Sequence, residues 1–162
     1  MNSNLLKTGK TEPFSFAIYI GFFAGLFGSI IRFIAHWFRF TQFDNSFLIY
    51  DWFVNLGRSS IVAVLLGSIS FIIFSIISSV IYMLLLRTKA GLLWGLLYGV
   101  IWWTILFIVS PLLISWPTTD IVLHLDSQVF ELCFMLVWGL FIGFSIAFEF
   151  TDEASHEPIY AK

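Results

Sequence analysis

Residues 90–115 read AGLLWGLLYGVIWWTILFIVSPLLIS, an uncharged stretch that decides the fold. Glycine occupies positions 91, 95 and 99, and on a helix residues four apart lie on the same face. These glycines leave one face without side chains, so another helix backbone can approach it closely. Small-residue faces of this kind pair helices in a bilayer, where lipid tails are as apolar as leucine. The stretch therefore predicts a membrane-spanning helix with a partner against its glycine face.

The composition of the whole chain indicates a membrane protein. Of its 162 residues, 59% are hydrophobic and 11% charged, and the mean hydropathy is +0.95. Soluble domains carry roughly 25% charged residues. The net charge of −2 and the lack of a basic cluster argue against nucleic acid as a partner. The single cysteine, Cys133, lies in an apolar run, where we expect a buried thiol, and it permits no internal disulfide.

Charged and polar residues divide the chain into four apolar stretches, each near the roughly 20 residues that cross a bilayer. The sequence thus predicts an all-α membrane protein, a bundle of four transmembrane helices within residues 13–150. The spans are expected at 14–37, 59–86, 90–115 and 128–150. Residues 43–56 fit either a short amphipathic helix in the interface or an aromatic-rich loop. The polar ends, 1–12 and the acidic 151–162, are expected to be disordered.

The connections and the charges predict how the bundle is oriented. Residues 87–89 form a link so short that the second and third spans should be antiparallel neighbours. An even number of spans places both termini on one side of the membrane. Most lysines and arginines outside the spans fall on that side, and only Arg39 and Arg58 fall on the other. The positive-inside rule therefore predicts cytoplasmic termini.

Arg32 is the most informative charged residue, because it lies inside the first span. A charge below the membrane surface is costly and by default points to function. In the predicted topology Glu131 lies at the same end of the bundle, so the two residues form a candidate intramembrane polar pair. Two other interpretations stay open. Arg32 extends its side chain to the interface from near its helix end, or it takes part in transport or catalysis.

The remaining polar candidates carry weaker signals. His36 and His124 fall towards the outer face, and Asp120 and Asp126 near His124 are metal-ligand types without a recognised spacing. Glu149 marks the cytoplasmic end of the fourth span, within reach of the basic residues at 87 and 89. No G-x-S-x-G, H-E-x-x-H or phosphate-binding loop sequence occurs. We therefore expect no catalytic residue, no cofactor and no metal ion.

Small residues give three of the spans a bare face. The candidate helix-packing positions are Gly21, Gly25, Gly91, Gly95, Gly99, Gly139 and Gly143. In the second span, Ser75 and Ser79 make a similar face. These faces either pack the four helices against one another or turn outward and build an oligomer. Packing within the chain is the simpler interpretation.

The end of the fourth span, Gly143-Phe-Ser-Ile-Ala-Phe-Glu149-Phe, resembles the corresponding part of the YqhR family of bacterial membrane proteins. The Phe38-Arg-Phe-Thr41 turn after the first span and Pro111 in the third are also similar. Four spans over 162 residues fit the family too, so the resemblance covers most of the chain. It implies a small multi-span protein of the cytoplasmic membrane in Bacillus-like bacteria. It implies no activity and transfers no functional residue.

Three functions are compatible with the sequence. The leading hypothesis is a non-catalytic accessory or scaffold component of the bacterial cell membrane. Its partners would be the lipid bilayer and another membrane protein or a second copy. A small transporter or channel would need a polar path, for which the second span offers serines and one end offers Arg32, His36 and Glu131. A lipid-processing membrane enzyme using the Asp120, His124 and Asp126 group ranks last.

Overall fold

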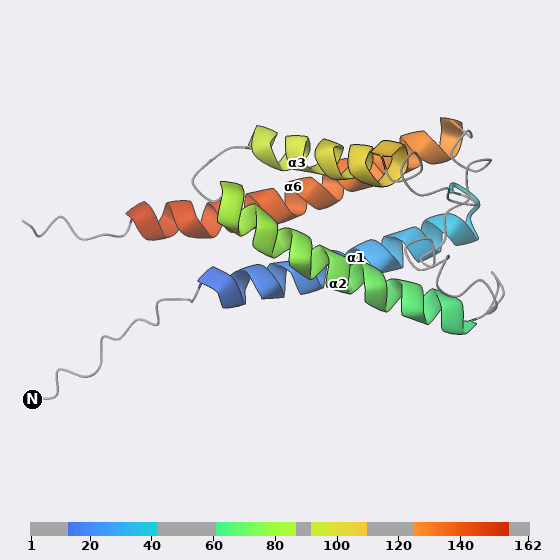
Figure 1. Ribbon diagram of the computed structural model, residues 1–162, viewed down its shortest axis with the longest axis horizontal. Helices are drawn as coiled ribbons and strands as arrows, with labels where there is room; N and C mark the ends of the chain where they lie inside the picture. Colours follow the sequence, from blue (N-terminus) through green and yellow to red (C-terminus); the bar gives the residue numbers. More distant parts are fainter. Residues whose placement is uncertain (1–12, 42–60, 87–91, 110–124, 156–162) are drawn as a thin grey trace, which may run out of the picture.

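The computed structural model describes residues 13–41, 61–86, 92–109 and 125–155. Helix α1 spans Pro13–Trp37, α2 spans Ile61–Leu86 and α6 spans Leu125–Ser155. Helix α3 spans Leu92–Thr104 and continues as a π-helical segment, η3, over Ile105–Val109. Four helical stretches are long and apolar enough to cross a membrane. The predicted all-α fold with four spans is confirmed (Figure 1).

The observed ends of α1 and α2 lie close to the ends predicted from the sequence, whereas those of α6 differ more. Helix α6 begins at Leu125 rather than at 128, and the carboxylate of Asp126 in its first turn suits the positive end of the helix dipole. It continues to Ser155, so residues 151–155 are helical, in contrast to the disordered tail that their acidic composition predicts. The predictions for residues 1–12, 43–56, 110–115 and 156–162 concern parts of the chain outside the described residues.

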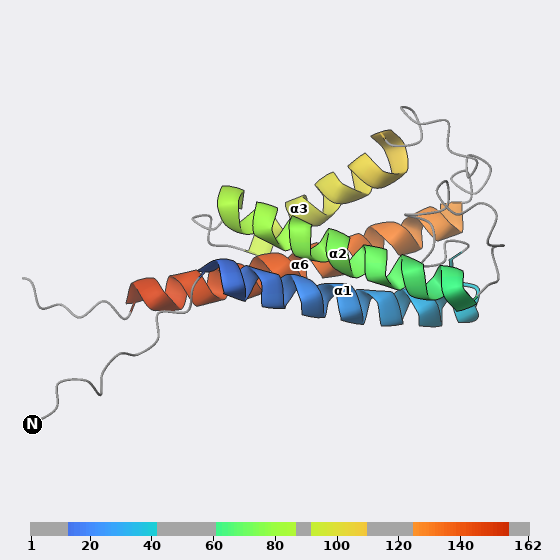
Figure 2. The ribbon, with the colours of Figure 1, turned by 60° about the horizontal axis from the view of Figure 1, so that its bottom comes forward.

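The helices form two antiparallel pairs, α1 with α2 and α3 with α6 (Figure 1). Helices α2 and α3 also run antiparallel, but their backbones lie farther apart than those within the pairs. They meet through large side chains, and α3 diverges from α2 towards its C-terminal end (Figure 2). The start of α1 and the end of α6 lie at the same end of the bundle.

Glycine lets the backbones within each pair touch. A Cβ atom added to Gly21 would lie 2.6 Å from the Cα of Ile76 on α2, and one added to Gly143 would lie 2.6 Å from the Cα of Gly95 on α3. Other glycines on α1, α3 and α6 are similarly close to a neighbouring backbone: Gly25, Gly99 and Gly139. Any side chain there would push the helices apart, so these faces pack within the chain. Gly91 lies outside the described residues.

Aromatic rings fill the wider space between the two helix pairs. Trp138 of α6 stacks on Phe74 of α2 with ring centroids 5.7 Å apart, and Phe74 meets Trp102 of α3 edge-to-face at 4.8 Å. Tyr82 of α2 likewise meets Tyr98 of α3 edge-to-face at 5.0 Å. Ring pairs contribute about 0.5–1.5 kcal/mol each beyond the area they bury. We refer to this layer as the aromatic seam: Phe71, Phe74, Tyr82, Tyr98, Trp102, Phe134 and Trp138.

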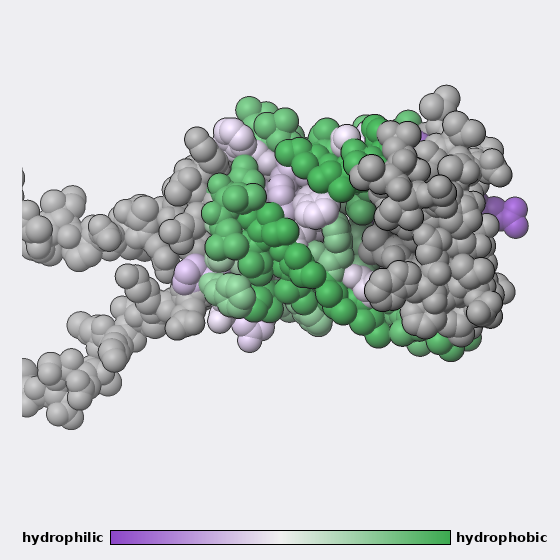
Figure 3. Space-filling model, viewed as in Figure 1, coloured by the Kyte–Doolittle hydropathy of each residue, from purple (hydrophilic) through white to green (hydrophobic). Residues whose placement is uncertain are grey.

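Apolar side chains cover much of the face of the described helices that Figure 3 shows. Large hydrophobic side chains are exposed on every helix, including Leu65 on α2, Leu97 on α3 and Phe144 on α6. A surface of this kind meets lipid tails in a bilayer, whereas a soluble monomer rarely exposes large apolar patches. Several polar side chains are instead buried between the helices. The described helices therefore have apolar side chains on the outside and polar side chains in the interior, the reverse of a soluble protein.

Candidate functional site

A sharp turn at the end of α1 forms one side of the candidate site. Arg39 has a φ of 60°, in the left-handed region that favours glycine. Its N–H donates to the carbonyl of His36 at 3.0 Å, and the N–H of Phe40 donates to the carbonyl of Ala35 at 2.9 Å. These two bonds form the Schellman arrangement that ends many helices. The turn brings the next residue, Thr41, into a buried position against α6.

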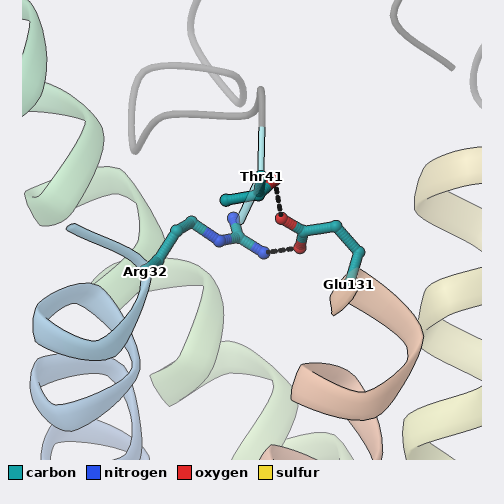
Figure 4. Close-up of polar contacts among 3 residues, drawn as sticks. All are labelled: Arg32, Thr41 and Glu131. Carbon is teal, nitrogen blue, oxygen red and sulfur yellow. Dashed lines mark hydrogen bonds and ion pairs between the residues drawn. The ribbon is translucent and has the colours of Figure 1, made fainter. Parts of the chain in front are cut away.

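Arg32 of α1 and Glu131 of α6 face each other across the bundle beside this turn (Figure 4). Nη2 of Arg32 donates to Oε2 of Glu131 at 2.5 Å, and the hydroxyl of Thr41 donates to Oε1 of Glu131 at 3.1 Å. The side chains of Arg32 and Glu131 are 1% and 0% exposed. The structure thus brings the two candidate residues together, and Arg32 is buried rather than extended to the interface.

Two phenyl rings enclose the guanidinium group of Arg32. Its Cζ lies 5.0 Å from the ring centroid of Phe71 on α2 and 4.8 Å from that of Phe134 on α6. The negative faces of aromatic rings attract a cation, by about 2 kcal/mol when the pair is desolvated. The charge of Arg32 is therefore balanced by one carboxylate and by two ring faces. We call this group the Arg32–Glu131 clamp: Arg32, Thr41, Phe71, Glu131 and Phe134.

The clamp lies just inside one end of the bundle. Arg32 is five residues before the last residue of α1, and Glu131 is six residues after the first residue of α6. At 1.5 Å per residue, both lie roughly 8–9 Å from their helix ends. Burying two charges is costly, and the attraction offsets that cost only when both partners are present. Loss of one partner is therefore more harmful than loss of both.

The clamp's contacts suit a structural junction better than a reaction centre. The Glu131 carboxylate accepts hydrogen bonds from Arg32 and Thr41, and both charged side chains are closed off from the surroundings. A group that binds or converts a substrate needs at least one accessible face. The clamp instead joins α1, α2 and α6 with the turn after α1.

Deeper in the bundle, serines of α2 bond to the neighbouring helices. The indole N–H of Trp138 donates to the hydroxyl of Ser75 at 3.0 Å, which links α6 to α2. Tyr98 donates its hydroxyl to the carbonyl of Ser78 at 2.6 Å, which links α3 to α2. Ser79 donates to a carbonyl of α1 at 2.7 Å. Three of the serines noted in the second span are therefore engaged in contacts between helices.

The other polar candidates do not join the clamp. His36 is exposed in the last turn of α1, and Asp126 is exposed in the first turn of α6. Glu149 is half-buried near the opposite end of α6. His124 and Asp120 lie outside the described residues. Within the described ranges, no three His, Cys, Asp or Glu side chains are grouped so that they could hold a metal ion.

The expectation of a buried thiol at Cys133 is wrong, because the side chain is exposed on the lipid-facing side of α6. Its neighbours Phe134 and Met135 point inward, and the 100° step of the helix turns Cys133 outward. Sequence reasoning also missed Thr41 and Phe71 as members of the clamp. A hydroxyl directly after the turn at residues 38–40 is a usable signal for Thr41. The choice of Phe71 among many phenylalanines has no signal in the sequence.

Comparison with known proteins agrees with a membrane protein. The model of the family described as "Conserved membrane protein YqhR" matches residues 3–159. A Bacillus subtilis (strain 168) protein described as "Uncharacterized protein YqhR" is 26% identical over 132 residues, which cover 82% of this chain and 74% of that protein. No solved structure matches the chain significantly. The resemblance noted from the sequence is confirmed, and because the family match covers nearly its whole length, the chain belongs to the YqhR family of membrane proteins.

Proposed function

We propose that this protein is a non-catalytic component of the bacterial cell membrane that acts through helix contacts with other membrane proteins or with itself. Its outer surface is the part that meets other molecules in the bilayer. The bundle supplies a rigid frame that presents this surface at fixed depth. The clamp and the aromatic seam hold that frame together.

One observation carries the proposal: the buried charged pair and the serines of α2 in the described helices are engaged with neighbouring groups of the bundle. Arg32 and Glu131 bond to each other, and serines of α2 bond to α1, α3 and α6. Two serines nearer the start of α2, Ser68 and Ser70, donate to carbonyls of their own helix. Interior groups that satisfy one another stabilise a bundle, whereas a transport path needs groups that face a water-filled cavity. The engaged interior therefore favours a contact role over transport.

The membrane and the topology belong to the same proposal. Most of the lysines and arginines outside the spans fall on the side of the two termini, which favours a cytoplasmic location for both. The clamp would then lie near the outer surface of the cell membrane. Cysteine substitution at positions outside the spans, followed by labelling of intact cells with a membrane-impermeant maleimide, tests this orientation.

Site-specific photocrosslinking in native membranes tests the contact role. A photoreactive phenylalanine analogue is placed at one exposed position on each helix: Phe23, Ile73, Leu97 and Phe144. We expect a discrete protein adduct from at least one position, because a contact surface occupies one face of the bundle. The four positions serve as controls for one another, since all of them face lipid in the isolated chain.

Lipid adducts alone from all four positions would contradict the proposal. Reconstitution of the purified protein into liposomes addresses the rival hypothesis directly. Ion or solute flux through the wild-type protein that is lost in Glu131→Gln would make the clamp part of a transport path. Absence of flux together with a protein adduct supports the contact role.

A further inference from the structure

The turn after α1 carries a cation on a strained backbone. Arg39, with its φ of 60°, occupies the position just after a helix end where glycine is the usual residue. Residues with a Cβ atom adopt this conformation rarely, because the Cβ comes too close to a carbonyl oxygen. Strained residues of this kind cluster at sites where the side chain has a function. Arginine in place of glycine therefore points to a role for the Arg39 side chain.

The Arg39 side chain is exposed among exposed aromatic residues. Trp37, Phe38 and Phe40 are between 65% and 76% exposed, and the rings of Phe38 and Phe40 lie side by side with centroids 6.3 Å apart. Within the described ranges, Arg39 and the buried Arg32 are the only lysine or arginine residues. In the same part of the chain, no carboxylate lies within ion-pair distance of the Arg39 guanidinium. Arg39 thus offers a cation without an internal counterion beside two adjacent rings.

Hydrogen bonds at both ends fix the position of the turn. At its start, the N–H of Phe38 donates to the carbonyl of Ile34 at 3.0 Å, and the N–H of Arg39 bonds back to the last turn of α1. At its end, the buried hydroxyl of Thr41 donates to Glu131 of α6. A turn that is already fixed loses little backbone freedom when its side chains bind a ligand. The turn therefore presents the Arg39 side chain in a preorganised place.

The length of α1 places this turn among the lipid headgroups. Helix α1 has 25 residues, so its last residue lies about 18 Å from its middle at 1.5 Å per residue. The hydrocarbon core reaches only about 15 Å from the bilayer centre, and the headgroup layer reaches roughly 20–22 Å. With the middle of α1 at the bilayer centre, residues 38–40 lie in the headgroup layer. The turn lies at the end of the bundle away from the start of α1 (Figure 1).

We propose that Arg39, with the rings of Phe38 and Phe40, binds the phosphate group of an anionic phospholipid in the leaflet at this end of the bundle. A guanidinium group binds two phosphate oxygens at once, which an ammonium group does not. Aromatic rings sit at the boundary between headgroups and acyl chains, so the paired rings suit the part of the same lipid below its phosphate. A zwitterionic headgroup carries an ammonium group that compensates its phosphate, so we expect weaker binding of such lipids. The site is independent of the proposed contact role.

The competing explanation is that Arg39 only stabilises the carboxyl end of α1 through the helix dipole. Native mass spectrometry of the purified full-length protein, titrated with phosphatidylglycerol in mild detergent, separates the two. Arg39→Gly removes the cation and suits the backbone conformation, so the turn is preserved. Arg58→Gly is the matched control, because it removes one charge from the same predicted side of the membrane.

We expect Arg39→Gly to weaken the binding of the first phosphatidylglycerol about tenfold or more, the size expected for loss of charge-assisted hydrogen bonds. Arg58→Gly should change it by less than about twofold, since exposed charges distant from the site are screened. Arg39→Lys should give an intermediate affinity. An equal loss in the two glycine variants, or no loss in Arg39→Gly, would overturn the proposal. An Arg39→Gly variant that unfolds more easily but binds the lipid normally would assign Arg39 to the helix dipole.

Further arms of the titration identify the ligand as a lipid. Inorganic phosphate in large excess should not displace phosphatidylglycerol, because it has no acyl chains for the rings to contact, and displacement would show a site for a soluble anion instead. Wild-type protein should bind phosphatidylglycerol more tightly than phosphatidylcholine, and Arg39→Gly should lose this preference. Phe40→Ser should weaken phosphatidylglycerol binding, whereas Phe144→Ser, at an exposed ring on α6, should not. Equal effects of the two serine variants would remove the rings from the site.

Discussion

The clamp predicts a characteristic pattern of stability in a double-mutant cycle. Arg32→Met leaves the Glu131 carboxylate buried without its cation, and Glu131→Leu leaves the guanidinium between two rings without its anion. Each single change should lower the free energy of unfolding by about 3–5 kcal/mol, as for other buried pairs that lose one partner. The double variant removes both charges and keeps similar side-chain volume. We expect it within about 2 kcal/mol of wild type, because Thr41 loses an acceptor and the cation–ring attraction is gone.

Equilibrium unfolding of the purified protein in mild detergent with added SDS measures the four free energies. The coupling between the two sites should be at least about 3 kcal/mol, well above the error of such measurements. Arg32→Lys serves as an intermediate control, since it keeps the charge but loses the planar group that lies between Phe71 and Phe134. Ile101→Ala on the outer face of α3 reports the effect of an ordinary lipid-facing change.

If the changes in the free energy of unfolding caused by Arg32→Met and Glu131→Leu were nearly additive in the double variant, the coupling between the two side chains would be refuted. If Arg32 extended to the interface, Arg32→Met would change the stability by no more than about 0.5 kcal/mol and would be indifferent to the residue at position 131. A double variant as unstable as the sum of the single variants would show that the two side chains contribute independently. Either result would show that the Arg32–Glu131 contact does not stabilise the packing of the two helix pairs against each other.

Other contacts predict smaller or opposite effects in the same unfolding assay. Gly99→Ala should lower the free energy of unfolding by about 1–3 kcal/mol, because the added Cβ would meet the backbone of α6 at Met135. Leu97→Ala on the outer face of α3 is the control, and an equal loss of stability in both variants would contradict the glycine packing. Trp138→Phe removes the indole donor to Ser75 and should lower the free energy of unfolding by about 1 kcal/mol. Adding Ser75→Ala should cause no further loss of stability, and an additive loss would argue against that hydrogen bond. Arg39→Gly should stabilise the protein by about 0.5 kcal/mol, since glycine adopts a φ of 60° without steric cost, and a destabilised variant would count against the turn geometry.

The sequence predicts the number, type and approximate ends of the helices because long uncharged runs have one solution in a bilayer. It also predicts which helices have bare faces, since glycines at 95 and 99 or at 139 and 143 repeat every four residues. It does not predict which bare faces meet. That choice depends on matching depth and crossing geometry between segments far apart in the chain. The short link at 87–89 predicts that the second and third spans are antiparallel neighbours, and α2 and α3 do meet through side chains, but the closest backbone contacts join α1 with α2 and α3 with α6.

The clamp is predictable only in part for a similar reason. Arg32 and Glu131 share one unusual feature, since each places a charge just inside a predicted span. The predicted topology puts both residues at the same end of the bundle. Whether the long arginine side chain turns inward or extends to water depends on what packs beside it. The rings of Phe71 and Phe134 and the hydroxyl of Thr41 make the inward position favourable, and they come from three different parts of the chain.

The central claim is that this protein acts through contacts in the membrane, and native mass spectrometry of complexes released directly from native membrane vesicles tests it most directly. A contact role predicts assemblies heavier than the 18.6 kDa monomer, either a homodimer or a complex of fixed stoichiometry with another membrane protein. Release at the lowest activation energy and at the native expression level preserves weak contacts. A spectrum that contains only the monomer with bound lipids would contradict the claim.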